Sequence, residues 1–589
     1  MLRPSFTGSA LVLTILVCAL FGATAQSAKP AAAPATTQSA MQRGQDALKS
    51  GDIERARKEF EAAVRVAPND ATAQSSLGWV LAQQGEANAA ILHLRAAIKL
   101  KPTFVDPRLT LAGVLAQQGK LAEGGEEARA ALKIAPEKAE AHRTLARILS
   151  RSSGDEALAE MRRASELAPD RADLRDELGT ILAQKSQFDD AEGSFRDAIR
   201  LQPSLESAHF HLGVVFLQKR QYDDAAKELS QAVEQAPQDA SAHYYLAKTL
   251  TAQSKAAEAL TELKKAATQK PDWFELQVEL GIASQRAGDI ESAVAAFEHA
   301  SRLHPQDAEL YNDLGLALLQ RGDAAGAISQ FQRALELHPQ DASLRGNLAI
   351  AYLQLANFDA AVNELDAALK IAPADASLHY NLGLAWKLKD QLDKAASEFQ
   401  EATRLQPDLV DAHYALGVLY WQRGEFDKAV VELQSAIQQQ PNYAEAHYTL
   451  GTVFKQQGRL PEAAAELREA IRLQPEFAGA HTTLAGVLRQ MGDSQGAGEE
   501  AKEGARIAAS VNNLQAATVA TNSGKRLLGT GDLDGAISQF QSAIHSEPKY
   551  AAAHYQLGLA LKQKGEKDEA RKEFQKAVEL DPRLTIPGN

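Results

Sequence analysis

The chain has 589 residues, with 63 Lys and Arg against 76 Asp and Glu and a single Cys. Its apolar content of 45% is ordinary for a globular protein and too high for a disordered chain. One cysteine excludes a disulfide framework and any zinc or iron–sulfur site built from cysteines. The net charge of −13 gives no basic surface of the kind that nucleic acid or anionic lipid needs.

The first 25 residues predict an export signal. Arg3 is the only charged residue before Lys29, and residues 10–21 form an apolar stretch. A helix needs about 20 apolar residues to cross a bilayer, so this stretch is too short for a membrane span. Residues 23–25 (Ala-Thr-Ala) then match the small-x-small pattern that signal peptidases accept, which predicts cleavage after Ala25.

Two other interpretations of this segment stay open: lipid anchoring through Cys18, and retention as an uncleaved anchor. Val17 precedes Cys18 where a lipoprotein signal would have a small residue, which favours cleavage. Removal of Arg3 would change the formal charge from −13 to −14 and leave no cysteine. We therefore predict export to the periplasm or cell envelope, or secretion, without stable membrane insertion after cleavage. The Ala- and Pro-rich residues 26–36 predict a linker.

The rest of the chain repeats with a period of 34 residues, which 15 of the 21 prolines reveal. They are Pro68, Pro102, Pro136, Pro169, Pro203, Pro237, Pro271, Pro305, Pro339, Pro373, Pro407, Pro441, Pro475, Pro548 and Pro582. When this proline is numbered position 32 of each repeat, 16 repeats fill residues 37–584, apart from five extra residues at 512–516. The period predicts one array of similar units.

Other positions of the repeat are also fixed, and they predict a helical hairpin. Position 8 is always Gly or Ala, position 20 is Ala except at Gly124, and position 27 is Ala except at Gly504. Position 24 is mostly Phe or Leu. Small residues at positions 8 and 20 would let two helices approach closely, and the large residue at 24 would fill the remaining space. Gly or polar residues near position 15 suit a helix C-terminus, and the proline closes the second helix.

This pattern resembles the tetratricopeptide repeat (TPR) family, whose consensus is W-x₂-L-G-x₂-Y…A-x₃-F…P. In the eleventh repeat the matching residues are Leu382, Gly383, Trp386, Ala395, Phe399, Ala402 and Pro407. The resemblance implies an all-α, right-handed superhelical solenoid of about 16 helix-turn-helix repeats, with the first helices lining a concave groove. The expected organisation is a signal peptide (1–25), a linker (26–36), repeats 1–14 (37–511), an insertion (512–516), repeats 15–16 (517–584) and a tail (585–589).

The insertion lies in the least regular part of the array. Repeat 14 lacks its terminal proline and has Ala501 at the aromatic position 24, and repeat 15 has Ser523 where Leu is expected. These departures predict a hinge or kink within residues 496–528.

Eight of the 14 histidines share position 4. They are His142, His209, His243, His379, His413, His447, His481 and His554. Packed helices lie about 8–10 Å apart, whereas the ligands of one zinc ion all lie ~2 Å from it, so this ladder cannot chelate a single ion. We interpret the histidines as packing residues and expect no metal or cofactor. The motifs GxSxG, HExxH and GxGxxG are absent from the sequence, so we predict no catalytic residues and no enzyme activity.

By resemblance, positions 2, 5, 6, 9, 12 and 13 face the groove. No repeat carries the Lys at position 5 with Asn at position 9 that relatives use to clamp a C-terminal carboxylate, and Asn occupies position 6 only at Asn347, Asn381 and Asn522. What remains is an aromatic and basic strip at positions 5 and 12 of repeats 11–14. It consists of Tyr380, Lys387, Tyr414, Trp421, Tyr448, Lys455 and Arg489.

Tyr, Trp and Arg carry much of the binding energy at interfaces, so the strip predicts a peptide-binding groove for an acidic or carboxylate-ended segment. The alternative is that these side chains are ordinary packing and solvated surface. The function that follows is an exported, non-enzymatic scaffold that binds other proteins in the cell envelope and does not bind nucleic acid. The alternatives are a structural subunit of an envelope secretion or polysaccharide-export machine and a carbohydrate-processing accessory.

Overall fold

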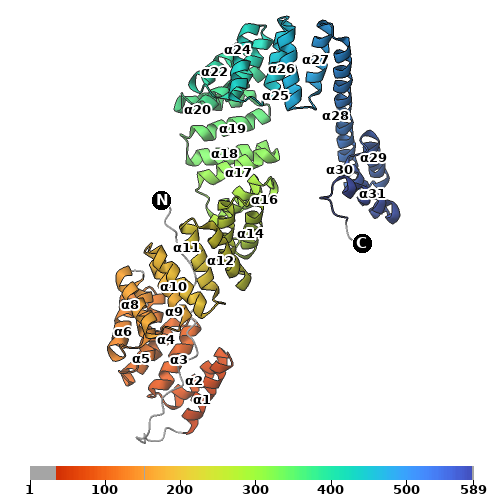
Figure 1. Cartoon of the computed structure of the whole chain (residues 1–589). Coiled ribbons are helices and arrows are strands. Elements are labelled where there is room, and N and C mark those ends of the chain that lie inside the picture. The colour runs from red at the N-terminus through yellow and green to blue at the C-terminus, as the bar shows by residue number, and fades with distance from the viewer. Residues whose placement is uncertain (1–34, 151–152, 587–589) are drawn as a thin grey trace. The chain divides into compact units, whose positions relative to one another are not determined.

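The computed structural model describes residues 35–150 and 153–586, and every regular element in these ranges is a helix (Figure 1). The predicted signal peptide at 1–25 lies outside the described residues, as does nearly all of the 26–36 linker. Helix α1 (Ala35–Lys49) already includes the last two linker residues. The all-α repeat solenoid expected from the sequence is confirmed. No helix of the described ranges has both the length and the apolar character needed to cross a bilayer.

The chain divides into two compact units, and the boundary falls between Pro305 and Gln306. The described helices of the first unit form eight consecutive pairs. They are α1 (Ala35–Lys49), α2 (Ile53–Val66), α3 (Ala71–Gln83), α4 (Ala87–Leu100), α5 (Val105–Gln117), α6 (Leu121–Ile134), α7 (Ala139–Leu149), α8 (Gly154–Leu167), α9 (Ala172–Gln184), α10 (Phe188–Leu201), α11 (Glu206–Gln218), α12 (Tyr222–Gln235), α13 (Ala240–Ala252), α14 (Ala256–Gln269), α15 (Phe274–Arg286) and α16 (Ile290–Leu303).

The second unit continues the same pattern of a first and a second helix in each repeat. Its described helices are α17 (Ala308–Arg321), α18 (Ala324–Leu337), α19 (Ala342–Gln354), α20 (Phe358–Ile371), α21 (Ala376–Leu388), α22 (Leu392–Leu405), α23 (Val410–Gln422), α24 (Phe426–Gln439), α25 (Ala444–Gln456), α26 (Leu460–Leu473), α27 (Ala478–Gln490), α28 (Ser494–Gly529), α29 (Leu533–Ser546), α30 (Ala551–Lys564) and α31 (Lys567–Leu580).

The two helices of a repeat touch where position 8 meets position 24. A Cβ atom on Gly383 would lie 2.6 Å from the Phe399 ring, and one on Gly417 would lie 2.8 Å from Cγ of Leu433. Phe399 and Leu433 are fully buried. The close approach predicted from the sequence is therefore confirmed, and glycine leaves the space that the large side chain fills.

The turn between the helices needs a left-handed residue at position 15. Gly85, Gly322 and Gly458 have φ values of 78°, 86° and 76° there, as the sequence predicts. Five repeats use a residue other than glycine at the same position, with φ values between 55° and 62°. They are Ser186, Arg220, Ser254, Ala356 and Asp390. Glycine is therefore favoured at this turn but not required.

Helix α28 differs from the sequence expectation. It runs without a break for 36 residues, from Ser494 to Gly529, and so joins the second helix of repeat 14 to the first helix of repeat 15 through the 512–516 insertion. The proline that ends every earlier second helix is replaced here by Ala509, which lets the i→i−4 hydrogen bonds continue. The helix is therefore not broken within 496–528, and the hinge or kink expected there stays a prediction.

Candidate functional site

The aromatic–basic strip lies on the first helices of repeats 11–14, which are α21, α23, α25 and α27. Positions 5 and 12 are seven residues apart, close to two helical turns, so they share one face of each helix. Helices α23, α25 and α27 contact one another in order. The predicted residues of α23, α25 and α27 therefore share one continuous face, and Tyr380 of α21 lies close enough to Asp411 of α23 for their charges to interact.

The tyrosines of the strip pack against rings of their own chain. The ring centroid of Tyr414 lies 4.9 Å from that of Tyr443, and Tyr448 lies 4.7 Å from Phe477 in the same way. Tyr380 packs 5.9 Å from Phe399, and burial raises the pKa of its phenol. These tyrosines are half-buried and line the sides of the strip.

Trp421 is fixed by a hydrogen bond between repeats. Its indole N–H donates to Oε1 of Gln456 on α25 at 2.8 Å, across the boundary between repeats 12 and 13. The ring stays partly exposed, with one edge held by the neighbouring helix. Because the ring is already fixed, its side chain loses less conformational entropy when a partner binds to it.

The three cations of the strip carry no ion pair within the described part of the chain. Basic residues of the second helices nearby are paired instead, for example Arg404 with Glu401 and Arg472 with Glu469. Burial lowers the pKa of the Lys387 ammonium, so its charge is less well solvated than usual. Asp411 and Glu445 lie at position 2 of α23 and α25, but within the described residues no ion pair joins them to the three cations of the strip. These three residues are Lys387, Lys455 and Arg489.

A glycine makes room for one of these cations. Gly486, at position 9 of α27, faces the end of Lys455, and a Cβ at this glycine would lie 3.3 Å from the Lys455 Nζ. The ammonium thus lies against the backbone of the next first helix while remaining half exposed.

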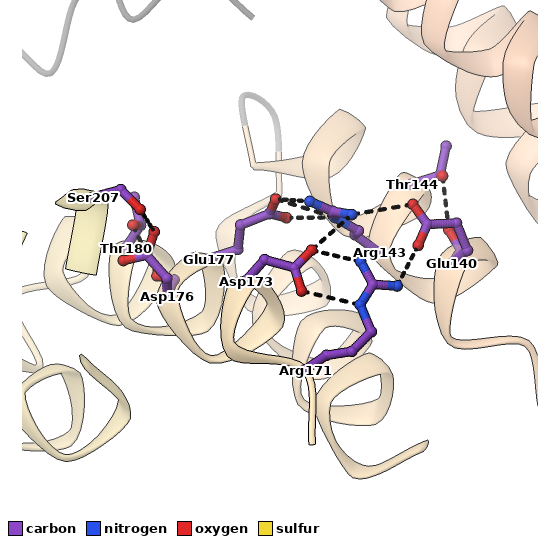
Figure 2. Close-up of polar contacts among 9 residues, drawn as sticks. All are labelled: Glu140, Arg143, Thr144, Arg171, Asp173, Asp176, Glu177, Thr180 and Ser207. Carbon is purple, nitrogen blue, oxygen red and sulfur yellow. Dashed lines mark hydrogen bonds and ion pairs between the residues drawn. The ribbon is translucent and has the colours of Figure 1, made fainter. Parts of the chain in front are cut away.

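A second cluster of charged side chains, which was not predicted from the sequence, lies in the first unit (Figure 2). Arg143 on α7 is buried and binds both oxygens of Glu177 on α9, and it lies 3.2 Å from Asp173. Arg171 binds Asp173 and also Glu140, the latter at 2.9 Å. Burial would lower the pKa of Arg143, but Glu177 with Glu140 and Asp173 raises it instead, so this guanidinium is always charged.

The cluster continues into repeat 6. Asp176, beside Glu177 on α9, accepts hydrogen bonds from the Ser207 hydroxyl and His211 Nδ1, each at 2.8 Å. Burial opposes protonation of His211, but Asp176 raises its pKa overall. The ion pairs and hydrogen bonds of this cluster join repeats 4, 5 and 6. Its signal in the sequence was the run of charges at positions 2, 5 and 6 of adjacent repeats.

The eight position-4 histidines lie at the junctions between repeats, which confirms them as packing residues. Each places Nδ1 2.5–2.7 Å from a Glu at position 23 of its own repeat. Each places Nε2 2.8–3.1 Å from the proline carbonyl that ends the preceding repeat. No three His, Cys, Asp or Glu side chains of the described ranges converge as a metal site.

Solved structures of repeat proteins resemble parts of this chain. One is the Cut9–Hcn1 hetero-tetramer of the APC/C, with 16% identity, 77% of this chain and 97% of that chain covered, and a TM-score of 0.35. Another is YrrB, a TPR protein with an unusual peptide-binding site (24% identity, 32% and 97% covered, TM-score 0.28). A third is MamA from Desulfovibrio magneticus RS-1 (25% identity, 29% and 96% covered, TM-score 0.27). A search of curated proteins finds no match.

Family models match along both units. One tetratricopeptide repeat model matches residues 41–103, 144–206, 177–239, 210–272, 278–342 and 521–584, which is more than half of the chain. Further tetratricopeptide repeat models match residues 81–148, 318–383 and 444–477, and a TPR repeat model matches 387–423 and 419–458. The protein therefore belongs to the tetratricopeptide repeat family.

Proposed function

We propose that this protein is an exported, non-enzymatic scaffold that binds an acidic segment of a partner protein through the strip on repeats 11–14. TPR proteins bind other proteins or peptides, and the observation that carries the assignment here is the row of unpaired cations around Trp421. Each cation is positioned on a first helix, and none has a carboxylate partner among the described residues.

The composition of position 12 supports this choice of repeats. From repeat 1 to repeat 10 the position holds only Leu, Ala, Ser, Thr or Gln. It then becomes Lys387, Trp421, Lys455 and Arg489 in four consecutive repeats. Position 12 is Leu528 in repeat 15 and Lys562 in repeat 16, so four consecutive basic or aromatic residues occur only in repeats 11–14. Such a run supports a local binding role for these repeats.

The spacing of the helices gives the partner a defined pattern. Neighbouring helices lie about 8–10 Å apart, and an extended peptide advances ~3.3 Å per residue, so one repeat corresponds to about three residues of partner. Carboxylates that face Lys387, Lys455 and Arg489 would then be about six and three residues apart, with an apolar or aromatic residue over Trp421. We propose such an acidic, extended segment as the ligand class.

The proposed location rests on residues 1–25, where a short apolar stretch precedes a small-x-small pattern. Mass spectrometry of the protein purified from its own cell envelope tests it. A mature N-terminus at Gln26 is expected, and an intact Met1 in the purified protein would contradict export with processing.

Binding is tested by calorimetry with synthetic extended peptides that carry Glu at the proposed spacing, against scrambled and Lys-substituted versions. The double variant Lys455→Glu with Arg489→Glu should weaken binding of the spaced peptide at least tenfold, which is about 1.4 kcal/mol. Arg468→Glu is the matched control, because Arg468 is an exposed cation on the second helix of repeat 13 and away from the strip. Equal affinity of the wild type and the double variant would refute the proposal.

A further inference from the structure

The histidine ladder has a property that packing alone does not explain. In repeats 11–14 it is unbroken, with His379, His413, His447 and His481 on the same four first helices that carry the strip. At His413 the imidazole Nδ1 lies 2.6 Å from Glu432 Oε2, and Nε2 lies 3.0 Å from the carbonyl oxygen of Pro407. The other three histidines repeat this arrangement.

Both groups that face each ring are acceptors. An ionised carboxylate and a backbone carbonyl have no proton to donate, and a neutral imidazole has only one N–H. A neutral ring can therefore satisfy one partner while its other nitrogen lone pair faces an oxygen lone pair. The imidazolium donates at both nitrogens and can therefore bind both acceptors. Protonation of the ring thus strengthens its contacts at the junction between repeats.

We propose that these four histidines form a pH-sensitive clamp that fastens each of repeats 11–14 to the repeat before it when protonated and loosens as pH rises. The clamp itself is independent of any ligand. Its consequence for binding rests on the proposed function, because the strip cations can meet a spaced acidic segment only if their helices keep a fixed separation.

Further charged groups lie near the rings at three of the four junctions. Glu401 and Glu469 on the second helices interact with His379 and His447 through their charge, and each also pairs with an arginine one turn further along. On α28, Glu503 interacts with His481 and pairs with Arg506, with Lys502 close to Glu503. The facing group from each preceding repeat is the uncharged proline carbonyl.

The direction of the pH effect follows from His413 and His447. The hydrogen bonds to Glu432 and Glu466 raise the pKa of these two imidazoles above the ordinary value, and burial only partly opposes this. A group whose pKa is raised on folding contributes its full stability below its unfolded pKa, which is about 6.5 for histidine. That contribution is lost as pH rises through the folded pKa, so the clamp loosens on the alkaline side of neutrality.

The chain itself supplies two kinds of natural control at position 4, arginine and glutamine. Arg345 reaches the same pair of acceptors, with Nη1 2.8 Å from Glu364 and Nη2 3.2 Å from the Pro339 carbonyl, and its charge does not titrate. Arg108 does likewise in repeat 3. Gln277 donates to the Pro271 carbonyl at 2.8 Å without any charge. The repeat therefore accepts arginine at position 4, which imitates the protonated imidazole, and glutamine, which imitates the neutral one.

The test uses the full chain in three forms: wild type, the quadruple variant with His379, His413, His447 and His481 all changed to Arg, and the same four changed to Gln. Hydrogen exchange is followed by mass spectrometry at pH 6 and pH 8, with correction for the intrinsic exchange rates and with repeats 2 and 3 as internal reference. In the wild type, protection across α21–α27 should fall several-fold from pH 6 to pH 8, because loss of the proton removes one hydrogen-bond donor from each junction.

In the Arg variant protection should be independent of pH, and in the Gln variant it should be low at both pH values. Equal pH dependence in the wild type and the Arg variant would refute the clamp. If the quadruple variants fail to fold, the single change His413→Arg, read at α23 and α24, decides the same question: a pH dependence at that junction equal to the wild type's refutes the clamp.

The spaced acidic peptide separates the clamp from the proposed function. If the peptide binds, wild-type affinity should fall several-fold more between pH 6 and pH 8 than the affinity of the Arg variant. Equal falls in affinity would refute the link to binding while the exchange result stands. If no form binds the peptide, the proposed function fails, and the exchange data still decide whether the clamp exists.

Discussion

The indole N–H of Trp421 donates to Oε1 of Gln456 at 2.8 Å, so the single tryptophan of the strip is tied to the first helix of the next repeat. The two residues are 35 positions apart, which is one repeat and one residue. The ring is therefore held in place before any partner arrives.

This relationship leads to a graded prediction for binding of the spaced acidic peptide. Trp421→Ala should weaken binding by about 2 kcal/mol or more, because it removes an aromatic anchor from the centre of the strip. Gln456→Ala should weaken it by only about 0.5–1.5 kcal/mol, since the ring stays and loses one hydrogen bond. Calorimetry measures both, and a larger loss for Gln456→Ala than for Trp421→Ala would show that the ring is not the anchor.

The contact between positions 8 and 24 predicts the effect of a single methyl group. Gly417→Ala should destabilise the second unit by about 1–3 kcal/mol, because its Cβ would lie 2.8 Å from Cγ of Leu433 and 3.3 Å from the Leu433 backbone nitrogen. Gly498→Ala in α28 is the control. Nothing lies within 4 Å of its Cβ position, and alanine favours a helix by up to about 1 kcal/mol over glycine. Urea unfolding followed by circular dichroism should therefore show opposite signs for the two variants.

The charge cluster of the first unit predicts a large cost for removing one member. Arg143→Met should destabilise the unit by about 3–5 kcal/mol, because it leaves Glu177 without its buried partner. Arg163→Met is the matched control, since Arg163 pairs with Glu137 and Glu166 on the surface, and such pairs contribute about 0–1 kcal/mol. Thermal unfolding of both variants checks this, and equal melting temperatures would contradict a structural role for the cluster.

The middle of α28 is helical but should have low local stability. Val511 and Leu514 are 57% and 47% exposed, and the buried residues of the helix flank this segment rather than fall within it. With few packing contacts, its amide hydrogens should exchange at least about tenfold faster than those of α24. Hydrogen exchange at neutral pH measures this, and protection equal to that of α24 would remove the hinge prediction for 496–528.

Much of the fold was predictable because its determinants are close in sequence. Gly383 and Phe399 meet within one hairpin, and the turn between their helices uses a left-handed residue that glycine supplies in most repeats. The histidine junction could also have been found in this way. A Glu follows each position-4 histidine by 19 residues, or by 18 in the shortened repeat 4, and this pairing was overlooked.

The path of α28 was not predictable from the broken period. Loss of the proline at Ala509 and the 512–516 insertion are compatible with a loop, a kink or an uninterrupted helix. Local propensity favours none of these decisively, because helices in proteins are stabilised mainly by tertiary packing. In the structure, the N-terminal part of α28 is the second helix of repeat 14 and its C-terminal part is the first helix of repeat 15.

The sequence by itself determined that this chain is an array of TPR hairpins, since a period of 34 residues and fixed small and large positions leave one way to bury the apolar faces. Only the tertiary structure decided which polar groups meet between repeats. Arg143 and Glu177 are 34 residues apart, and their pairing depends on the angle and spacing at which one hairpin stacks on the next. Small shifts in that stacking move side-chain tips by more than a hydrogen-bond length, and no pattern of residue types along the chain specifies them to that precision.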